Sequence, residues 1–242
     1  MLQFKSLSKS YPSKSGIVHA VREASATVAP GELVALSGPS GSGKTTLLLM
    51  LGLVELPDNG TLILSGKSLV ASGKPLADVR AERRLSIGYI FQRPNLVPFL
   101  NAIENILVIE NMAAKRRKDL RDTAFKLMER LGIEQLHDRL PTQMSGGEQQ
   151  RVAICRALIN SPKLICADEP TASLDGKRAE GVVSALREAV TRQECAAIVS
   201  THDARMLPLF DRVLKMDDGI LHEEVGNLLN ALDVKGSEND RC

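Results

Sequence analysis

Residues 38–45 carry the pattern of an anion-binding loop. The run Gly38-Pro39-Ser40-Gly41-Ser42-Gly43-Lys44-Thr45 has the complete spacing of a phosphate loop, between a short apolar run and a helix-forming segment. Its glycines let successive backbone N–H groups turn toward phosphate oxygens. The Lys44 ammonium can neutralise β and γ phosphates, and the Thr45 hydroxyl can bind Mg²⁺. A Gly-Ser-rich loop that binds nothing is the alternative, but the complete pattern in this context favours a nucleotide.

Two adjacent carboxylates, Asp168 and Glu169, stand at the end of the apolar run 163–168. At the carboxyl edge of a parallel sheet they would lie in the ligand crevice, close to the phosphate loop. Neighbouring strand residues point to opposite faces, so we expect the two acids to have different tasks. Asp168 is suited to holding Mg²⁺ through a water, and Glu169 to polarising an attacking water. Two surface acids at a strand end are the alternative interpretation.

The stretch QMSGGEQQRVAI, residues 143–154, predicts a second anion site. Ser145, Gly146 and Gly147 run directly into good helix formers, which leaves backbone N–H groups unpaired at the positive end of a helix dipole. Such a helix end favours an anion. Within one chain this second site is redundant, because the phosphate loop already surrounds a triphosphate.

These residues must be positioned by elements that alternate along the chain. Apolar runs predict strands at 31–38, 85–92, 163–168 and 196–202, and helical patterns cover 93–143, 143–160 and 176–192. Hairpins are expected at 61–69, around a Ser-Gly turn, and at 211–224, around Asp218-Gly219. Strands that alternate with helices predict an α/β fold with a largely parallel, doubly wound sheet.

Composition argues against several classes of protein. A net charge of +2 over 242 residues is too small for nucleic-acid binding through bulk electrostatics, and 3% aromatic residues without Trp argue against base stacking. No run of about 18 apolar residues occurs that could cross a membrane. The cysteines have no CxxC spacing, and Cys155, Cys166 and Cys195 lie in apolar patterns that predict buried, reduced thiols.

Taken together, the motifs resemble those of the ATP-binding-cassette ATPases over almost the whole chain. Residues 144–158, MSGGEQQRVAICRAL, look like the signature sequence of that family, and Gln92 matches its Q-loop. The run Ser173-Leu174-Asp175 matches the D-loop, and His202 matches the switch histidine. Tyr11 stands where the family places an aromatic ring on adenine, with a plain surface tyrosine as the alternative.

The resemblance implies the fold and its parts. We expect an α/β P-loop NTPase core of the RecA-like type with a mostly parallel sheet, an N-terminal antiparallel β subdomain and an inserted α-helical subdomain. A single cassette domain would span residues 1–234. Its core and β subdomain would occupy 1–92 and 155–234, the helical subdomain with the signature would occupy 93–154, and a polar tail would follow at 235–242.

The resemblance also assigns roles in the binding and hydrolysis of Mg-ATP. Glu169 would be the general base, His202 would bind the γ-phosphate, and Lys44 and Gln92 would complete the catalytic group. Thr45, Gln92 and Asp168 would hold Mg²⁺, Asp168 through a water. Residues expected to contact the nucleotide or its neighbouring protomer are Tyr11, Gly38, Pro39, Ser40, Gly41, Ser42, Gly43, Lys44, Thr45, Thr46, Gln92, Ser145, Gly146, Gly147, Glu148, Asp168 and Asp175.

The implied function is that of a transporter ATPase bound peripherally at the cytoplasmic face of the inner or plasma membrane. Two copies, or one copy and a similar cassette, would close around two Mg-ATP and drive a separate permease, and through it a periplasmic adaptor. Ser145, Gly146 and Gly147 would then act on the other copy's ATP. The alternative is a cassette that moves no solute and acts as a mechanical switch on a membrane partner, as cell-division regulators do.

The signature also points to a subgroup. Met144 and Glu148 replace the Leu and Gln of the common LSGGQ sequence. The SGGE form and the run IGYIFQRPNLVPFLNAIENI, residues 87–106, resemble the subgroup of macrolide exporters and lipoprotein-release complexes. That resemblance favours export or release as the transport type, while the substrate itself would be selected by the membrane subunit.

The surface for the membrane partner is expected just after Gln92. Residues 93–111 include the apolar side chains Leu96, Val97, Phe99 and Leu100, for which core positions in the helical insertion are the alternative. The basic run Lys115-Arg116-Arg117-Lys118 indicates a solvated helix face, or a contact with anionic lipid.

Overall fold

A computed structural model describes residues 1–14, 16–109, 117–172, 174 and 176–224. Its central feature is a six-stranded sheet in the order β11-β10-β3-β9-β8-β7. Neighbouring strands are parallel except for the β10–β11 pair. The strands are β3 (Leu33–Ser37), β7 (Ile87–Ile90), β8 (Leu164–Asp168), β9 (Ala196–Ser200), β10 (Arg212–Asp217) and β11 (Ile220–Glu224). All residues of β8 and β9 are buried, as expected for parallel strands covered on both faces.

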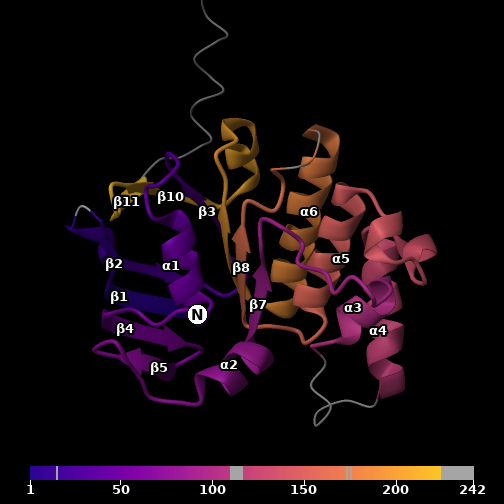
Figure 1. The fold of residues 1–242 in the computed structure, drawn as a ribbon, viewed down its shortest axis with the longest axis horizontal. Coiled ribbons are helices and arrows are strands. Elements are labelled where there is room, and N and C mark those ends of the chain that lie inside the picture. The colour runs from indigo at the N-terminus through magenta and orange to yellow at the C-terminus, as the bar shows by residue number, and fades with distance from the viewer. Residues whose placement is uncertain (15, 110–116, 173, 175, 225–242) are drawn as a thin grey trace, which may run out of the picture.

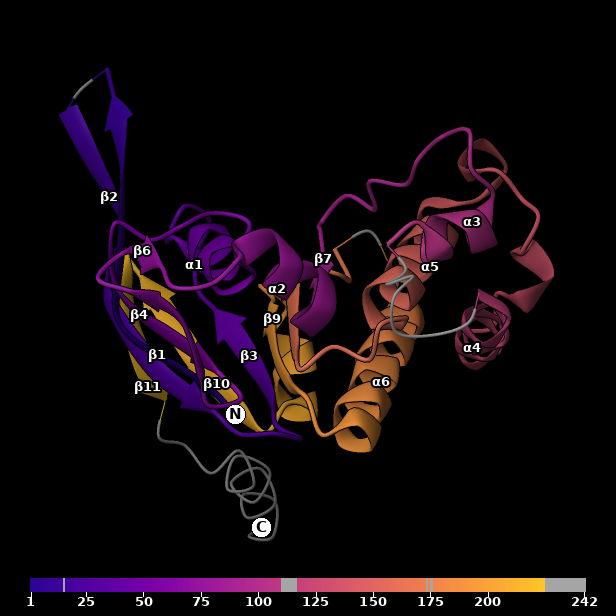
Figure 2. The same cartoon turned by 90° about the horizontal axis from the view of Figure 1, so that it is seen from below.

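A second, antiparallel sheet lies at one end of the molecule (Figure 1). Its order is β2-β1-β4-β5-β6, from β1 (Leu2–Ser13), β2 (Gly16–Val28), β4 (Asn59–Leu64), β5 (Lys67–Ala71) and β6 (Lys74–Pro75). Helix α1 (Lys44–Leu51) packs between the two sheets, where Leu48 and Leu51 share one apolar core with Phe4 and Leu214. The outer part of the β1–β2 hairpin projects beyond the rest of the fold (Figure 2).

The helical part lies at the opposite end, beyond β7 (Figures 1 and 2). Helices α3 (Ala102–Leu107), α4 (Arg117–Arg130) and α5 (Gly146–Leu158) pack there around Ile106, Met128 and Ile154, which belong to the second apolar core. The remaining helices are α2 (Val79–Ser86), α6 (Gly176–Gln193) and the short 3₁₀ segments η1 (Glu134–Leu136), η2 (Pro141–Gln143) and η3 (Ala204–Leu209). None of the helices in the described ranges has the length and apolar character that crossing a bilayer requires.

The predicted fold class is confirmed: an α/β fold with a mostly parallel sheet, an antiparallel β part and an inserted helical part. Both predicted hairpins form. Each turn, Ser65-Gly66 and Asp218-Gly219, has two consecutive residues with positive φ, the combination that two-residue hairpins favour. Cys155, Cys166 and Cys195 are buried free thiols, as predicted.

Two predicted boundaries are wrong. Leu85 and Ser86 end helix α2 instead of starting a strand, because Asp78 accepts hydrogen bonds from the Arg80 and Ala81 amides and starts a helix that was not predicted. The predicted helical character of 93–143 also fails in its first part: residues 93–101 form no helix, and α3 begins only after Asn101, its N-cap. The predicted tail, 235–242, lies outside the described residues.

Candidate functional site

The predicted phosphate loop connects β3 to α1 at the carboxyl edge of the parallel sheet. Its backbone is confined by neighbouring chain segments. A Cβ on Gly38 would lie 2.1 Å from the Met216 carbonyl oxygen, and one on Gly43 would lie 2.1 Å from that of Ala20. Both residues also have positive φ, 148° and 103°. These two positions therefore require glycine for reasons of space as well as conformation.

Lys44 lies at the centre of the loop and is 7% exposed. Its ammonium donates hydrogen bonds of 2.8 Å to the carbonyl oxygens of Gly38 and Pro39. The loop borders a cleft of about 330 Å³, lined by Ala20, Ser40, Gly41, Gly43, Lys44, Thr45, Thr46, Gln92, Asp168 and Glu169. The cleft thus combines backbone N–H groups, a helix N-terminus and a cation on one side with two carboxylates on the other.

The two predicted carboxylates, Asp168 and Glu169, have different surroundings. Asp168 ends β8, is buried, and accepts a 2.7 Å hydrogen bond from the Ser200 hydroxyl. The same hydroxyl accepts a 2.9 Å hydrogen bond from the Glu169 amide. Glu169 has a φ of 44°, in the left-handed region that is costly for a residue with a side chain. Ser200 was not among the predicted residues, although a serine that ends the adjacent apolar strand, two residues before His202, is a usable signal.

Glu169 is the meeting point of residues from three parts of the chain. Gln92, two residues after β7, donates a 3.1 Å hydrogen bond from Nε2 to Glu169 Oε2. His202, two residues after β9, places Nδ1 3.2 Å from Glu169 Oε1. The His202 side chain is 64% exposed, whereas that of Glu169 is 20% exposed. A carboxylate held by an amide and an imidazole at the edge of an anion site is arranged to accept a proton from water.

Tyr11 lies on β1, beside the start of α1. Its hydroxyl donates a 2.6 Å hydrogen bond to Glu55 Oε2, and the Lys9 ammonium lies 5.8 Å from the ring centroid. Burial, together with the Glu55 contact, raises the pKa of Tyr11. The ring is therefore held in place by Glu55, a residue that the sequence pattern did not indicate.

The signature residues lie away from this cleft. Ser145 is the N-cap of α5: its hydroxyl accepts from the Glu148 amide, and Glu148 Oε2 accepts from the Ser145 amide at 2.7 Å. A Cβ on Gly147 would lie 2.7 Å from a methyl carbon of Leu174. Ser145, Gly146, Gly147 and Glu148 do not line the 330 Å³ cleft. The structure therefore brings the phosphate loop, Gln92, Asp168, Glu169 and His202 together, but it leaves the signature apart from them.

Two predicted groups cannot be placed. Ser173 and Asp175 lie outside the described residues, and so do Lys115 and Arg116 of the basic run, whereas Arg117 and Lys118 are the first two residues of α4. Of the apolar side chains after Gln92, Phe99 is 77% exposed, while Leu96, Val97 and Leu100 are half-buried.

The donor set of the cleft fits a magnesium ion. Thr45, Gln92 and Asp168 all line it, and they offer a hydroxyl, an amide and a carboxylate. These are hard oxygen donors, and Mg²⁺ is commonly held by one or two carboxylates together with substrate phosphates and waters. No cluster of three or more His, Cys, Asp or Glu side chains able to hold a metal occurs among the described residues. The site is therefore of the kind that a metal shares with a phosphate ligand.

Comparison with known proteins gives one consistent result. Residues 21–172 match the family described as ABC transporter. The lipoprotein-releasing system ATP-binding protein LolD of Paramagnetospirillum magneticum is 38% identical over 92% of this chain and 97% of its own length. The LolD 2 protein of Caulobacter vibrioides is 40% identical over 91% and 96%. HrtA of Staphylococcus haemolyticus, whose name assigns it to hemin import, is 38% identical over 90% and 97%.

Solved structures agree with the sequence matches. A dimeric post-hydrolysis state of the ATP-binding cassette MJ0796, bound to ADP and Pi, superposes with a TM-score of 0.83. It shares 32% identity and covers 93% of this chain and 100% of its own. A second dimeric structure of MJ0796, described as a bacterial ABC transporter cassette, gives the same TM-score at 31% identity.

Proposed function

The chain belongs to the ABC transporter family and is one of its ATPases, and we propose that two copies close around two Mg-ATP to drive a separate membrane permease. The observation that carries this proposal is the position of the signature, which lies outside its own chain's nucleotide cleft. A helix N-terminus favours an anion through its dipole, but it acts as an anion site only if an anion reaches it. A second copy would supply that anion as the γ-phosphate in its own cleft.

We assign the residues of the cleft as follows. Lys44 and the loop amides bind the phosphates, Glu169 takes the proton of the attacking water, and His202 contacts the γ-phosphate. Gln92 positions the water beside Glu169, in keeping with its hydrogen bond to that carboxylate. Thr45, Gln92 and Asp168 would hold Mg²⁺, which when bound neutralises charge on the phosphates. Tyr11 would stack on the base, and Asp175 would connect the protomers.

The assignment of Lys44 predicts a loss of affinity. Replacing Lys44 with Ala is expected to raise the Kd for ATP about 10- to 100-fold, since a charge-assisted hydrogen bond contributes about 1.5–3 kcal/mol. Titration calorimetry measures this directly. Lys163→Ala, on the short connection before β8, is a matched control that should leave the Kd unchanged. Equal ATP affinity of Lys44→Ala and the wild type would contradict the assignment of residues 38–45 as the phosphate-binding loop.

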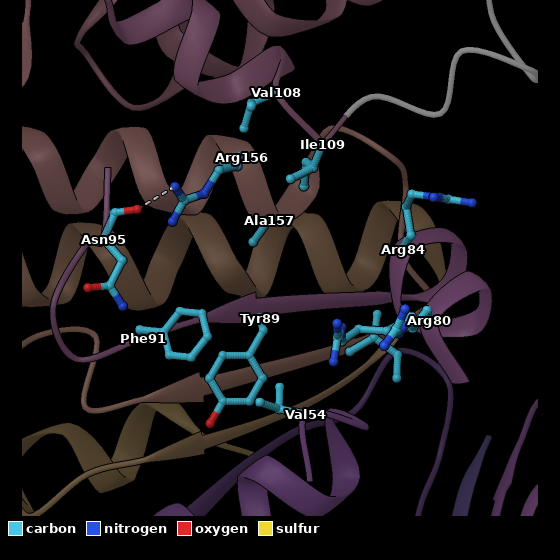
Figure 3. A pocket seen from close by; sticks show the side chains of 12 residues that line it. Val54, Arg80, Arg84, Tyr89, Phe91, Asn95, Val108, Ile109, Arg156 and Ala157 are labelled. Atoms are coloured by element: carbon cyan, nitrogen blue, oxygen red, sulfur yellow. Dashed lines mark hydrogen bonds between the residues drawn. The ribbon is translucent and has the colours of Figure 1, made fainter. Parts of the chain in front are cut away.

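A groove lies between the sheet and the helical part, and it supports the proposal that a membrane partner docks on this chain (Figure 3). It has a volume of about 620 Å³ and begins where the segment after Gln92 leaves the sheet. Its apolar lining includes Val54, Tyr89, Phe91, Val108 and Ala157. Four arginines also line it, Arg80, Arg83, Arg84 and Arg156. We call this surface the docking groove.

The charge of the docking groove identifies the chemistry of its occupant. Arg83 donates to the Leu53 carbonyl and Arg156 to two further carbonyls, and none of the four arginines forms an ion pair with a carboxylate of the described residues. Guanidinium groups with an apolar floor between them complement an amphipathic segment that carries carboxylates. We therefore propose that an acidic, amphipathic segment of the permease docks here.

Charge reversal tests this docking. The double variant Arg80→Glu/Arg84→Glu is expected to lose membrane association at least about tenfold, because like charges across an interface are strongly unfavourable. Its ATPase rate as purified protein should stay within about twofold of wild type. The measurements are the fraction of tagged chain in native membranes and the permease that co-purifies with it. Lys5→Glu/Lys74→Glu, two exposed lysines on the antiparallel sheet, makes the same charge change elsewhere. Equal loss in both double variants would contradict a specific groove.

Transport is favoured over the mechanical-switch alternative. The names of the relatives assign them to lipoprotein release and to hemin import, which are both movements of a solute. Together with the SGGE form of the signature, the LolD relatives support export or release, at the cytoplasmic face of a membrane and with an adaptor reached through the permease. The proposed division of the chain keeps residues 1–92 and 155–234 as core and β subdomain, with residues 93–154 as the helical part.

A further inference from the structure

Helix α5 holds both ends of the segment that carries Gln92. Gln150 donates a 3.2 Å hydrogen bond from Nε2 to the Phe91 carbonyl oxygen. One turn and a half later, Arg156 donates to the carbonyl oxygens of Pro94 and Asn95, at 2.7 and 2.9 Å. Figure 3 shows Arg156 reaching from α5 to Asn95. Gln92 lies between these anchor points, so its backbone is tied to α5 on either side.

Both anchor side chains, Gln150 and Arg156, carry a free-energy cost through the burial of polar or charged groups. Gln150 is 1% exposed, and its Oε1 has no hydrogen-bond partner among the described residues. Burial lowers the pKa of Arg156, whose charge meets only neutral carbonyls in the described part of the chain. Asn95, whose carbonyl Arg156 holds, has a φ of 49° in the left-handed region. A leucine at 150 would pack without an orphaned oxygen, so stability alone does not explain this glutamine.

Gln150 and Arg156 together form what we call the clamp. Its function follows from the other residues that α5 carries. The helix begins at Ser145, the signature residue, and Gln92 hydrogen-bonds to Glu169. On the basis of the proposed function, we infer that Gln150 and Arg156 are positioning residues that make Gln92 move with the signature helix. When α5 moves toward the partner's nucleotide, Gln92 moves by the same rigid connection relative to Glu169. Closure on one nucleotide thereby sets the position of Gln92 beside the general base of the other.

Gln150→Leu separates this role from a structural one. The substitution removes the orphaned oxygen of Gln150, which is stabilising, and the donor to the Phe91 carbonyl, which is destabilising, so the melting temperature should shift by no more than about 4 °C. The kcat for ATP is expected to drop about tenfold, within the range of couplings seen in one hydrogen-bond network, while the KM for ATP stays unchanged. An unchanged kcat, or a fall in stability that accounts for the lost rate, would overturn the inference.

A double-mutant cycle with Gln92 is the sharper measurement. If Gln150 acts through Gln92, then Gln92→Ala/Gln150→Leu should turn over no more slowly than Gln92→Ala alone. Rates that multiply would mean that Gln150 acts independently, and the inference would fail. Should Gln150→Leu not fold, Arg156→Met replaces it in the cycle, since methionine keeps an unbranched apolar stem but donates to neither carbonyl.

Asn160 supplies the matched control. It follows α5 and also donates to backbone carbonyls, those of Arg84 and Ile109, but not within the Gln92 segment. Asn160→Leu should change kcat by less than about twofold and should combine multiplicatively with Gln92→Ala. The wild-type rate is measured first. Absence of wild-type hydrolysis would count against the proposed function. If the wild type is active but the rate effects of Gln92→Ala and Gln150→Leu multiply, only the clamp is contradicted.

Discussion

Glu169→Gln is expected to bind ATP with wild-type affinity and to hydrolyse it about 10²–10⁴-fold more slowly, the usual contribution of a general base. Glutamine has nearly the same shape, so the contacts with Gln92 and His202 can persist while the proton acceptor is lost. Calorimetry measures the affinity, and phosphate release in a single turnover measures the chemical step.

The control for this substitution is a carboxylate that lies outside the cleft. Glu188 on α6 pairs with Arg192 at 3.0 Å and does not line the cleft. Glu188→Gln should therefore hydrolyse ATP at the wild-type rate. Hydrolysis by Glu169→Gln at the wild-type rate would exclude Glu169 as the base, and a simultaneous loss of ATP binding would indicate a damaged site instead.

Ser145→Arg is expected to retain ATP binding to its own phosphate loop and to lower turnover about 10²–10³-fold, the cost of losing a group that stabilises transition-state charge. Ser145 lies outside its own cleft, so the bulky side chain leaves that cleft unchanged. It would instead occupy the space that the partner's γ-phosphate needs. ATP binding by calorimetry and steady-state ATPase rates measure the two effects separately.

Loss of the helix cap must be distinguished from loss of the shared site, because Ser145 caps α5 and removing a cap costs about 1 kcal/mol. Ser145→Asp retains a capping oxygen but would bring a carboxylate against the partner's phosphates, and also against Glu148 Oε2, to which the Ser145 hydroxyl donates at 2.8 Å. Its melting temperature is therefore measured beside its activity, and it should still bind ATP while losing turnover. Ser145→Thr retains both the cap and the hydroxyl and should stay active. A fully active Ser145→Asp would contradict the assigned contact.

The features that the sequence predicted well are encoded locally. Gly38 to Thr45 form the loop because their spacing and their flanking strand and helix lie within one short stretch. Glu148 is partly of this kind. Its departure from Gln resembles the signature of the subgroup, and the structure adds that it completes a capping box with Ser145, a Ser-x-x-Glu pattern that is readable from sequence.

The features that the sequence did not predict depend on long-range contacts. Glu55 lies 44 residues from the Tyr11 that it holds, Gln150 lies 59 residues from Phe91, and Ser200 lies 32 residues from Asp168. No local pattern encodes such pairs, because they exist only once the sheet order is set. The proposed docking groove overlaps the predicted partner surface, residues 93–111, only in part, since its arginines on α2 belong to a helix that was not predicted.

The central claim, a nucleotide site shared between two copies, is tested most directly by the mass of the Glu169→Gln chain in solution. Light scattering should give one 26.2-kDa copy without nucleotide and the mass of two copies with saturating Mg-ATP. Adding Ser145→Arg to the same chain should return the mass to one copy while ATP remains bound. A single-copy mass for Glu169→Gln under conditions where calorimetry shows bound ATP would contradict the account.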